Sequence, residues 1–145
     1  MSIEVNNISK NYGTQKALEG VSFTIQKGEI VGFLGPNGAG KSTLMKILTT
    51  YIAADEGTAS VNGFDVHAQQ KAVQQSIGYL PEHNPLYLDL YVREYLEFNA
   101  DVYRVSKNRI EEVIVLTGLT AESHKKIGQL SKGYRQRVGL ANALL

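Results

Sequence analysis

A glycine-rich segment in the first third of the chain has the residue types and spacing of a phosphate-binding loop. Gly35-Pro36-Asn37-Gly38-Ala39-Gly40-Lys41-Ser42 matches the pattern G-x-x-x-x-G-K-[ST] at every position. In such a loop, glycines let consecutive backbone N–H groups turn inward, and the N-terminus of the following helix adds partial positive charge. The loop lysine brings a full charge to the outer phosphates, and the final hydroxyl is a ligand for Mg²⁺. A glycine-rich turn that binds nothing is the alternative.

Two flanking segments have the patterns needed to position this loop. Ile30–Leu34 is apolar on both faces, which predicts a fully buried strand of a parallel sheet directly before the loop. Directly after it, apolar residues recur at helical spacing, at Leu44, Ile47, Leu48 and Tyr51. The loop therefore stands between a predicted strand and a predicted helix, which is the context that phosphate binding requires.

The remaining segments predict a sheet followed by helices. Further strands are expected at Ile3–Ile8, Gly20–Gln26, Ala59–Val61 and Ser76–Leu80, with a short polar helix at Val66–Gln75. Beyond Pro81 the strand signal ends, and three apolar stripes predict helices. The stripes are Val92, Tyr95, Leu96, Asn99, Val102 and Tyr103; then Ile110, Val113, Ile114 and Thr117, with Gly118 as a stop; then Tyr134, Val138, Ala141 and Leu145.

Composition excludes several classes of protein. The 145 residues carry 15 Lys+Arg against 14 Asp+Glu, and this net charge of +1 favours neither a nucleic-acid binder nor an acidic tail. The hydrophobic fraction of 43% is typical of a folded domain. The sequence has no cysteine, which excludes disulfides and thiolate metal sites. With neither a signal-peptide pattern nor an apolar run of membrane-spanning length, a soluble intracellular chain is expected.

Charge is unevenly distributed along the sequence. After Ser123 the chain has five cations and no acidic residue; the cations are Lys125, Lys126, Lys132, Arg135 and Arg137. A solvated helix face explains such a run, and a basic end that faces an anionic ligand is the other interpretation.

The segment Leu130–Ala141 connects the chain to a known family. It reads Leu-Ser-Lys-Gly-Tyr-Arg-Gln-Arg-Val-Gly-Leu-Ala and resembles the signature motif of ABC-type ATPases, whose common form begins Leu-Ser-Gly-Gly-Gln. Lys132 replaces a glycine of that form, and Tyr134 replaces the glutamine. Ser131 is of a type that caps helices, and a cap with no other role is the alternative.

Two further positions match the same family. Tyr12 resembles the aromatic residue that stacks on adenine, and an exposed tyrosine without a role is the alternative. Ile77–Glu82 resembles the Q-loop segment, where the family usually has a glutamine that binds Mg²⁺ and the attacking water. Here Glu82 takes that place; a carboxylate binds Mg²⁺ but cannot donate a hydrogen bond as an amide does.

The resemblance covers the whole chain and implies a fold. It implies an α/β P-loop NTPase core sheet of the ABC ATPase type plus a helical subdomain, truncated at the C-terminus. The ATP-binding core is expected at residues 1–81, the helical subdomain at 82–131 and the signature helix at 132–145. The wording of Tyr79–Tyr87 and Leu130–Ala141 is most similar to ATP-binding subunits of ABC-2-type exporters, in particular the gliding-motility-associated group.

The same resemblance implies an ATPase that uses ATP and Mg²⁺. It implies a head-to-tail homodimer on integral membrane permease subunits, at the cytoplasmic face of the cell membrane, with no nucleic acid. Catalytic roles fall on Lys41 and Glu82, and Mg²⁺ binding on Ser42 and Glu82. The residues expected to contact nucleotide are Tyr12, Gly35, Asn37, Gly38, Ala39, Gly40, Lys41, Ser42 and Thr43, with Ser131 and Gly133 facing the nucleotide of a second copy.

One part of the family pattern does not occur. An apolar strand ending in Asp-Glu, which supplies the general base, follows the signature helix in the family, whereas this sequence ends at Leu145. We therefore expect a truncated chain that binds ATP but barely hydrolyses it, and whose sheet has an open, destabilising or self-associating edge. Other interpretations are a soluble ABC-type ATPase that acts on ribosomes or DNA, a small-molecule kinase and a non-enzymatic fragment. The kinase leaves Leu130–Ala141 unexplained.

Overall fold

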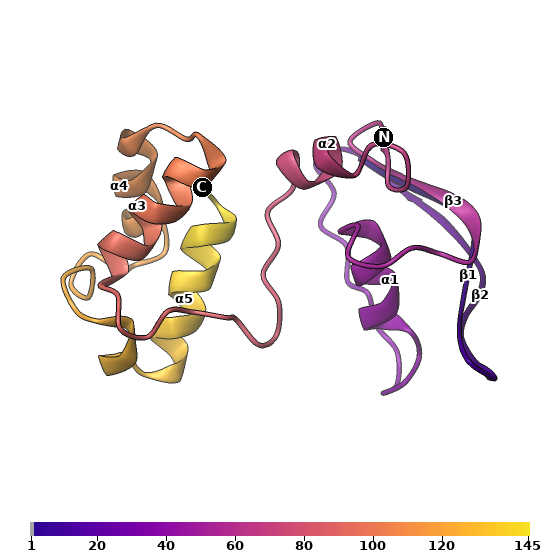
Figure 1. The fold of residues 1–145 in the computed structure, drawn as a ribbon, viewed down its shortest axis with the longest axis horizontal. Coiled ribbons are helices and arrows are strands. Elements are labelled where there is room, and N and C mark those ends of the chain that lie inside the picture. The colour runs from indigo at the N-terminus through magenta and orange to yellow at the C-terminus, as the bar shows by residue number, and fades with distance from the viewer. Residues whose placement is uncertain (1) are drawn as a thin grey trace. The chain divides into compact units, whose positions relative to one another are not determined.

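The computed structural model describes residues 2–145, which form two compact units (Figure 1). The first unit ends at Ile77 and contains the sheet, and the second spans Gly78–Leu145 and is built from helices. Each unit buries its own cluster of apolar side chains. The order of a sheet followed by helices agrees with the sequence pattern.

Four antiparallel strands form the sheet of the first unit, in the order β2-β1-β3-β4. The strands are β1 (Ile3–Tyr12), β2 (Gln15–Ile25), β3 (Glu56–Val61) and β4 (Phe64–Asp65). A register shift in β1 lets Val5 and Ile8, three residues apart, both be buried. Asn62 and Gly63, with φ of 51° and 84°, make the tight turn between β3 and β4. The expected strands around residues 3–8, 20–26 and 59–61 are confirmed.

Two short helices accompany this sheet. In α1 (Lys41–Leu48), Leu44, Ile47 and Leu48 are buried, as their spacing predicts, but Tyr51 lies beyond the helix end and is 77% exposed. α2 (Gln70–Gln75) fills only the second half of the helix expected at 66–75. The first half is a turn, because the Asp65 carboxylate accepts hydrogen bonds from the N–H groups of the second and third residues after it, at 2.8 and 2.7 Å.

Two expected strands do not form. Ile30–Leu34 has no regular secondary structure and lies outside the sheet, with Ile30 fully exposed and Leu34 91% exposed, so the prediction of a buried parallel strand was wrong. Ser76–Leu80 is likewise irregular. A run that is apolar on both faces becomes a central strand only where neighbouring strands pair with it. Within residues 2–145, no strand pairs with either segment.

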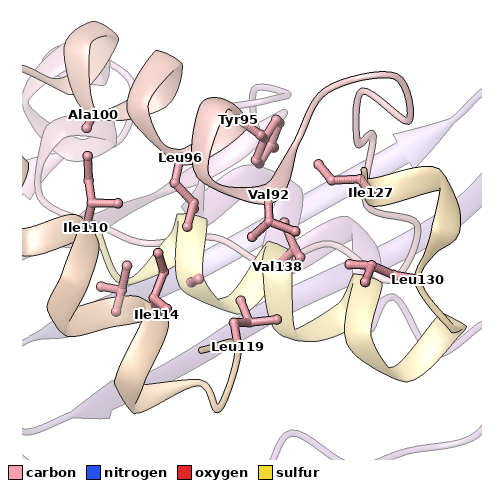
Figure 2. Close-up of a cluster of buried hydrophobic side chains, with 12 residues drawn as sticks. Val92, Tyr95, Leu96, Ala100, Ile110, Ile114, Leu119, Ile127, Leu130 and Val138 are labelled. Carbon is pink, nitrogen blue, oxygen red and sulfur yellow. The ribbon is translucent and has the colours of Figure 1, made fainter. Parts of the chain in front are cut away.

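Three α-helices and one short 3₁₀ turn form the second unit. They are α3 (Val92–Tyr103), α4 (Lys107–Leu116), η1 (Ile127–Gln129) and α5 (Lys132–Ala143). Their apolar faces meet in one cluster, shown in Figure 2, which consists of Val92, Tyr95, Leu96, Ala100, Ile110, Val113, Ile114, Leu119, Ile127, Leu130, Val138 and Ala141. Burial of these side chains is the main source of stability of this unit.

The helical stripes of the sequence account for most of this cluster. α3 has the predicted bounds, and its N-terminus is closed by Glu94, whose carboxylate accepts from the Tyr91 N–H at 3.2 Å. Val102 and Tyr103 are exposed, however, and Ala100 takes the place expected for them. Gly118, with φ of 67°, follows α4 as expected. Among the described residues, no helix is both long and apolar enough to cross a membrane.

Candidate functional site

The glycine-rich loop of the first unit leads directly into the N-terminus of α1. Its turn is closed by the Ala39 N–H, which donates to the Pro36 carbonyl at 3.2 Å. The first helical hydrogen bond runs from the Leu44 N–H to the Gly40 carbonyl at 2.9 Å. The N–H groups of Lys41–Thr43 precede that bond and therefore have no partner within the helix, which leaves them available to an anion.

Lys41 lies over the same loop. Its ammonium group donates to the carbonyl oxygens of Gly35 and Pro36, at 2.6 and 2.7 Å. A lysine ammonium has three protons, so one donor remains for a phosphate oxygen while two fix the side chain in place. Ser42 is exposed beside it, with its hydroxyl one residue into the helix, and Thr43 is partly buried. Charge and free amides thus converge at one helix terminus.

Gly40 fixes the loop against the sheet. Its φ of 80° is left-handed, and a Cβ added there would overlap the Ala17 carbonyl oxygen and approach Leu18 Cδ2 to 2.6 Å. At Gly38, whose φ is 83°, an added Cβ would meet nothing within 4 Å. The loop therefore depends on Gly40 for close packing on β2, whereas Gly38 supplies a turn in open space. Asn37 and Ala39 are exposed between these positions.

Tyr12 ends β1 at the hairpin against which the loop packs. Its side chain is 49% exposed, and its cross-strand partner is Gln15. Gln15 precedes Ala17 by two residues, which is about 7 Å along the strand. The hairpin thus contains both the exposed aromatic ring and the residues against which Gly40 packs, Ala17 and Leu18. An exposed ring at this place has the flat apolar face that stacking on a base requires.

Glu82 belongs to the second unit and lies in the irregular segment before α3. It is exposed, and its backbone carbonyl accepts a hydrogen bond from the Gln136 side chain at 3.5 Å. Across residues 2–145, no cation or hydrogen-bond donor is assigned to its carboxylate. The carboxylate is therefore free to bind a ligand from outside the unit.

The donor set decides how Mg²⁺ would bind. The described part of the chain contains no group of three or more His, Cys, Asp and Glu that could hold a metal by itself. Mg²⁺ is commonly bound through one or two protein oxygens together with substrate phosphates and water. The exposed Ser42 hydroxyl in the first unit and, considered by itself, the Glu82 carboxylate in the second unit are oxygens of the type that Mg²⁺ binds.

The start of α5 presents Ser131 and Gly133 to solvent. The Ser131 hydroxyl accepts from the Tyr134 N–H at 3.4 Å, which confirms the predicted cap. A Cβ added at Gly133 would meet only the Ser131 oxygen, at 4.0 Å, so packing within this unit does not require glycine there. Lys132 and Tyr134 flank this small residue, and the unpaired amides of a helix N-terminus favour an anion.

The cations of the basic C-terminal run make mostly internal contacts. Lys125 pairs with Glu122 at 2.9 Å, and Lys126 lies over the Tyr91 ring. The other contacts are internal too: Arg135 donates to the Ile127 and Gly128 carbonyls, and Arg137 stacks on Tyr134 and donates to the Gly118 carbonyl. Most of these cations contact loops of the helical unit, but within residues 2–145 only Lys125 among them pairs with a carboxylate, so the run keeps its positive charge and the ligand-facing basic end stays a prediction.

The structure adds residues that the sequence pattern did not single out as functional. Gln136 holds the backbone of Glu82, and Gly139 lies under Asn84 in the middle of α5. A glycine inside a predicted helix costs about 0.5–1 kcal/mol relative to alanine. The presence of Gly139 there was the one available signal that another segment approaches α5 closely.

The loop, its lysine and its junction with α1 define a protein of the phosphate-loop class, and comparison with known proteins narrows the class. The sequence profile of the family described as ABC transporter matches residues 18–145 of this chain. The chain is 36% identical to the bacitracin transport ATP-binding protein BcrA of Bacillus licheniformis, over 99% of this chain and 47% of the relative. It is 35% identical to the linearmycin resistance ATP-binding protein LnrL of Bacillus subtilis, with the same coverage.

Solved structures give the same result for the fold. An ATP-binding subunit of an ABC transporter matches with a TM-score of 0.87 and 29% identity, over 99% of this chain and 62% of that structure. A nucleotide-free ATP-binding cassette matches with a TM-score of 0.83 and 25% identity, over 99% and 64%. The chain belongs to the ABC transporter family, and the predicted ABC ATPase fold is confirmed. It spans about half the length of the curated relatives it matches.

Proposed function

We propose that this chain is part of the ATP-binding subunit of an ABC transporter and binds Mg²⁺–ATP at its glycine-rich loop. The observation that carries the proposal is the convergence of the Lys41 ammonium and the free N–H groups of Lys41–Thr43 at the N-terminus of α1. A triphosphate matches this site in charge and in its number of acceptor oxygens.

The proposal assigns a role to each residue of the loop. Gly35, Gly38 and Gly40 shape the backbone, and the amides from Asn37 and Ala39 onward surround the β-phosphate. Lys41 neutralises the outer phosphates, and Ser42 and Glu82 would hold Mg²⁺, which would supply further positive charge to the phosphates. Thr43 contributes its backbone amide, and the Tyr12 ring stacks on adenine. Glu82 is also the group that orients the attacking water.

The proposed assembly is a head-to-tail pair of ATP-binding subunits. In it, Ser131 and Gly133 of one copy face the nucleotide held by the other copy. The capped and open start of α5 supports this assignment, because the fold itself makes no use of the space beside Gly133. Closure of the pair on ATP would then move the attached membrane subunits.

The proposed biological role is export through permease subunits at the cytoplasmic face of the membrane, in the gliding-motility group. Bacitracin transport, linearmycin resistance and Nod factor export stand in the names of relatives, and a sulfate/thiosulfate import protein of Methylococcus capsulatus matches at 36% identity. The sequences of Tyr79–Tyr87 and Leu130–Ala141, which resemble those of ABC-2-type exporters, support export rather than import. Co-purification of the protein with a polytopic membrane protein supports this role, and co-purification with ribosomes contradicts it.

Calorimetric titration with Mg²⁺–ATP tests the binding proposal. The wild-type chain should bind, and Lys41→Ala should weaken binding by at least about 1.5–3 kcal/mol, the value of a hydrogen bond to a charged group. Equal affinities for the two proteins would refute the site.

A second experiment tests the pairing role. Ser131→Arg places a long cation at the start of α5, on an exposed position. We expect it to abolish ATP-dependent pairing in sedimentation experiments while ATP binding by the monomer stays within about twofold. A parallel loss of both properties would show that Ser131 acts within the monomer and not across a pair.

A further inference from the structure

The segment 78–84, which contains Glu82, forms a narrow loop that packs along α5. Gly78 lies on the C-terminal end of the helix, where an added Cβ would overlap the Ala143 carbonyl oxygen. Leu80 then reaches Gly139, and the Glu82 carbonyl meets the Gln136 side chain. The segment thus runs antiparallel to the helix, from its last turn toward its first, with Glu82 at the far point.

After Glu82 the segment turns back, and Asn84 again contacts the middle of α5, at Gly139. An added Cβ at Gly139 would overlap Asn84 Nδ2, approach Asn84 Cγ to 2.7 Å and approach Leu80 Cδ1 to 2.8 Å. Both arms of the loop therefore rest on one glycine, which is buried in the helix. No side chain larger than hydrogen fits at this position while the segment keeps its course.

Shape rather than hydrogen bonding holds this contact. Asn84 Nδ2 is buried, and the described residues provide no acceptor for it; Asn142 Oδ1, one turn beyond Gly139, is buried without a donor. Buried polar atoms are nearly always paired, so two unpaired ones beside the same glycine are unusual. An arrangement that leaves them unpaired persists only where the surrounding packing determines the position of the segment.

The start of the same helix carries Ser131 and Gly133, the residues assigned to the nucleotide of a second copy. Ser131 caps α5, and Gln136 follows about 7.5 Å further along the helix axis. Since the Glu82 backbone is attached at Gln136 and its two arms rest on Gly139, any shift of the helix is transmitted to Glu82. A rigid α5 therefore fixes the backbone of Glu82 relative to the Ser131 cap.

We propose that Gly139, together with Gln136, is a positioning residue that holds the backbone of the Glu82 segment and thereby the carboxylate proposed to bind Mg²⁺. The inference rests on the proposed function, because it takes Glu82 as a ligand of Mg²⁺. Gly139 itself touches neither metal nor nucleotide. It acts by admitting the Glu82 segment to the helix surface, and a methyl group at Gly139 displaces both arms of that segment.

The test compares ATP affinity with Mg²⁺ and with EDTA, by calorimetric titration of the full chain. The gain from Mg²⁺ is the ratio of the ATP affinity measured with Mg²⁺ to the ATP affinity measured with EDTA. Loss of a group that orients a metal ligand costs about 10- to 100-fold in metal affinity, so this gain should be about tenfold smaller in Gly139→Ala. The affinity for metal-free ATP should change less than about twofold, since phosphate binding at Lys41 does not involve Glu82. Leu140→Ala, on the exposed neighbour, is the matched control and should keep the wild-type gain from Mg²⁺.

A second variant separates positioning from simple damage to the helix. Asn84→Ala removes the group that an added methyl would strike, so Gly139→Ala/Asn84→Ala should recover most of the gain from Mg²⁺. Gln136→Ala, at an exposed position, removes the hydrogen bond to Glu82 without a clash and should also lower the gain from Mg²⁺. This variant tests the proposal even where Gly139→Ala does not fold. Amide hydrogen exchange of residues 78–84 should rise in Gly139→Ala and fall back in the double variant.

The outcomes distinguish the two levels of proposal. An unchanged gain from Mg²⁺ in Gly139→Ala and Gln136→Ala, with a lost gain in Glu82→Ala, overturns the positioning role alone. Failure of the double variant to recover either the gain or the exchange pattern also overturns it. An unchanged gain in Glu82→Ala refutes the metal role of Glu82 and, with it, this inference. Absence of ATP binding by the wild-type chain refutes the proposed function.

Discussion

The packing of Gly40 on β2 gives the sharpest prediction about the phosphate loop. Gly40→Ala adds a Cβ that overlaps the Ala17 carbonyl oxygen and lies 2.6 Å from Leu18 Cδ2, at a φ of 80°. The left-handed backbone costs an alanine about 1–2 kcal/mol. Overpacking against a neighbouring strand typically costs about 1–3 kcal/mol more. The first unit should therefore lose about 2–5 kcal/mol of unfolding free energy.

Gly38→Ala is the matched control, because its φ of 83° is nearly the same and its added Cβ meets nothing within 4 Å. It should lose only the backbone contribution of about 1–2 kcal/mol. Urea unfolding of both variants, followed by the amide NMR signals of β1 and β2, measures the difference. Equal losses in the two variants would show that contact with β2 does not hold the loop.

Three further predictions concern other parts of the chain. Backbone hydrogen bonds, chiefly from Ala68, hold the pKa of Asp65 below its ordinary value of 3.8, so the ionised carboxylate stabilises the fold above that pH and the stabilisation is lost as the pH falls through the lower folded pKa. Acid unfolding followed by circular dichroism should consequently be less steep in Asp65→Asn. Leu96→Ala should destabilise the helical unit by about 2–5 kcal/mol in urea, whereas Val115→Ala on the exposed face of α4 stays within about 0.5 kcal/mol. Ser131→Ala should cost about 1 kcal/mol in the same assay, and Ser131→Asn should restore most of it, because asparagine also caps helices.

The helical unit could be predicted from the sequence because its signals are local. Leu96 and Ile114 lie on stripes whose helical spacing needs no knowledge of the partner, and the observed helices bury both. Ser131 caps α5 because its hydroxyl reaches an amide three residues later, which is also a local relation. The glycine loop and Lys41 follow the same rule, since their spacing alone determines how they enter α1.

The parts that could not be predicted depend on distant segments. Ile30–Leu34 has the composition of a central strand, but whether it becomes one depends on partners elsewhere in the chain. The basic residues near the C-terminus carry charge that the sequence shows, yet their destinations, such as the Gly128 carbonyl for Arg135, arise only in the folded unit. The contact of Asn84 with Gly139 joins positions that are far apart in the sequence, and only the glycine indicated it.

The strand order also sets a sequence of folding events. β1 and β2 are joined by the two-residue turn Gly13-Thr14, and such a hairpin forms within about 1–10 μs. β3 reaches β1 only after the chain from residue 13 to residue 55 has closed on itself, which is entropically costly and slows folding. The phosphate loop lies inside that closing stretch. On a ribosome, the loop can contact the β1–β2 hairpin early, but its unit cannot be completed before the chain has emerged as far as Val73, which is buried in the core of that unit.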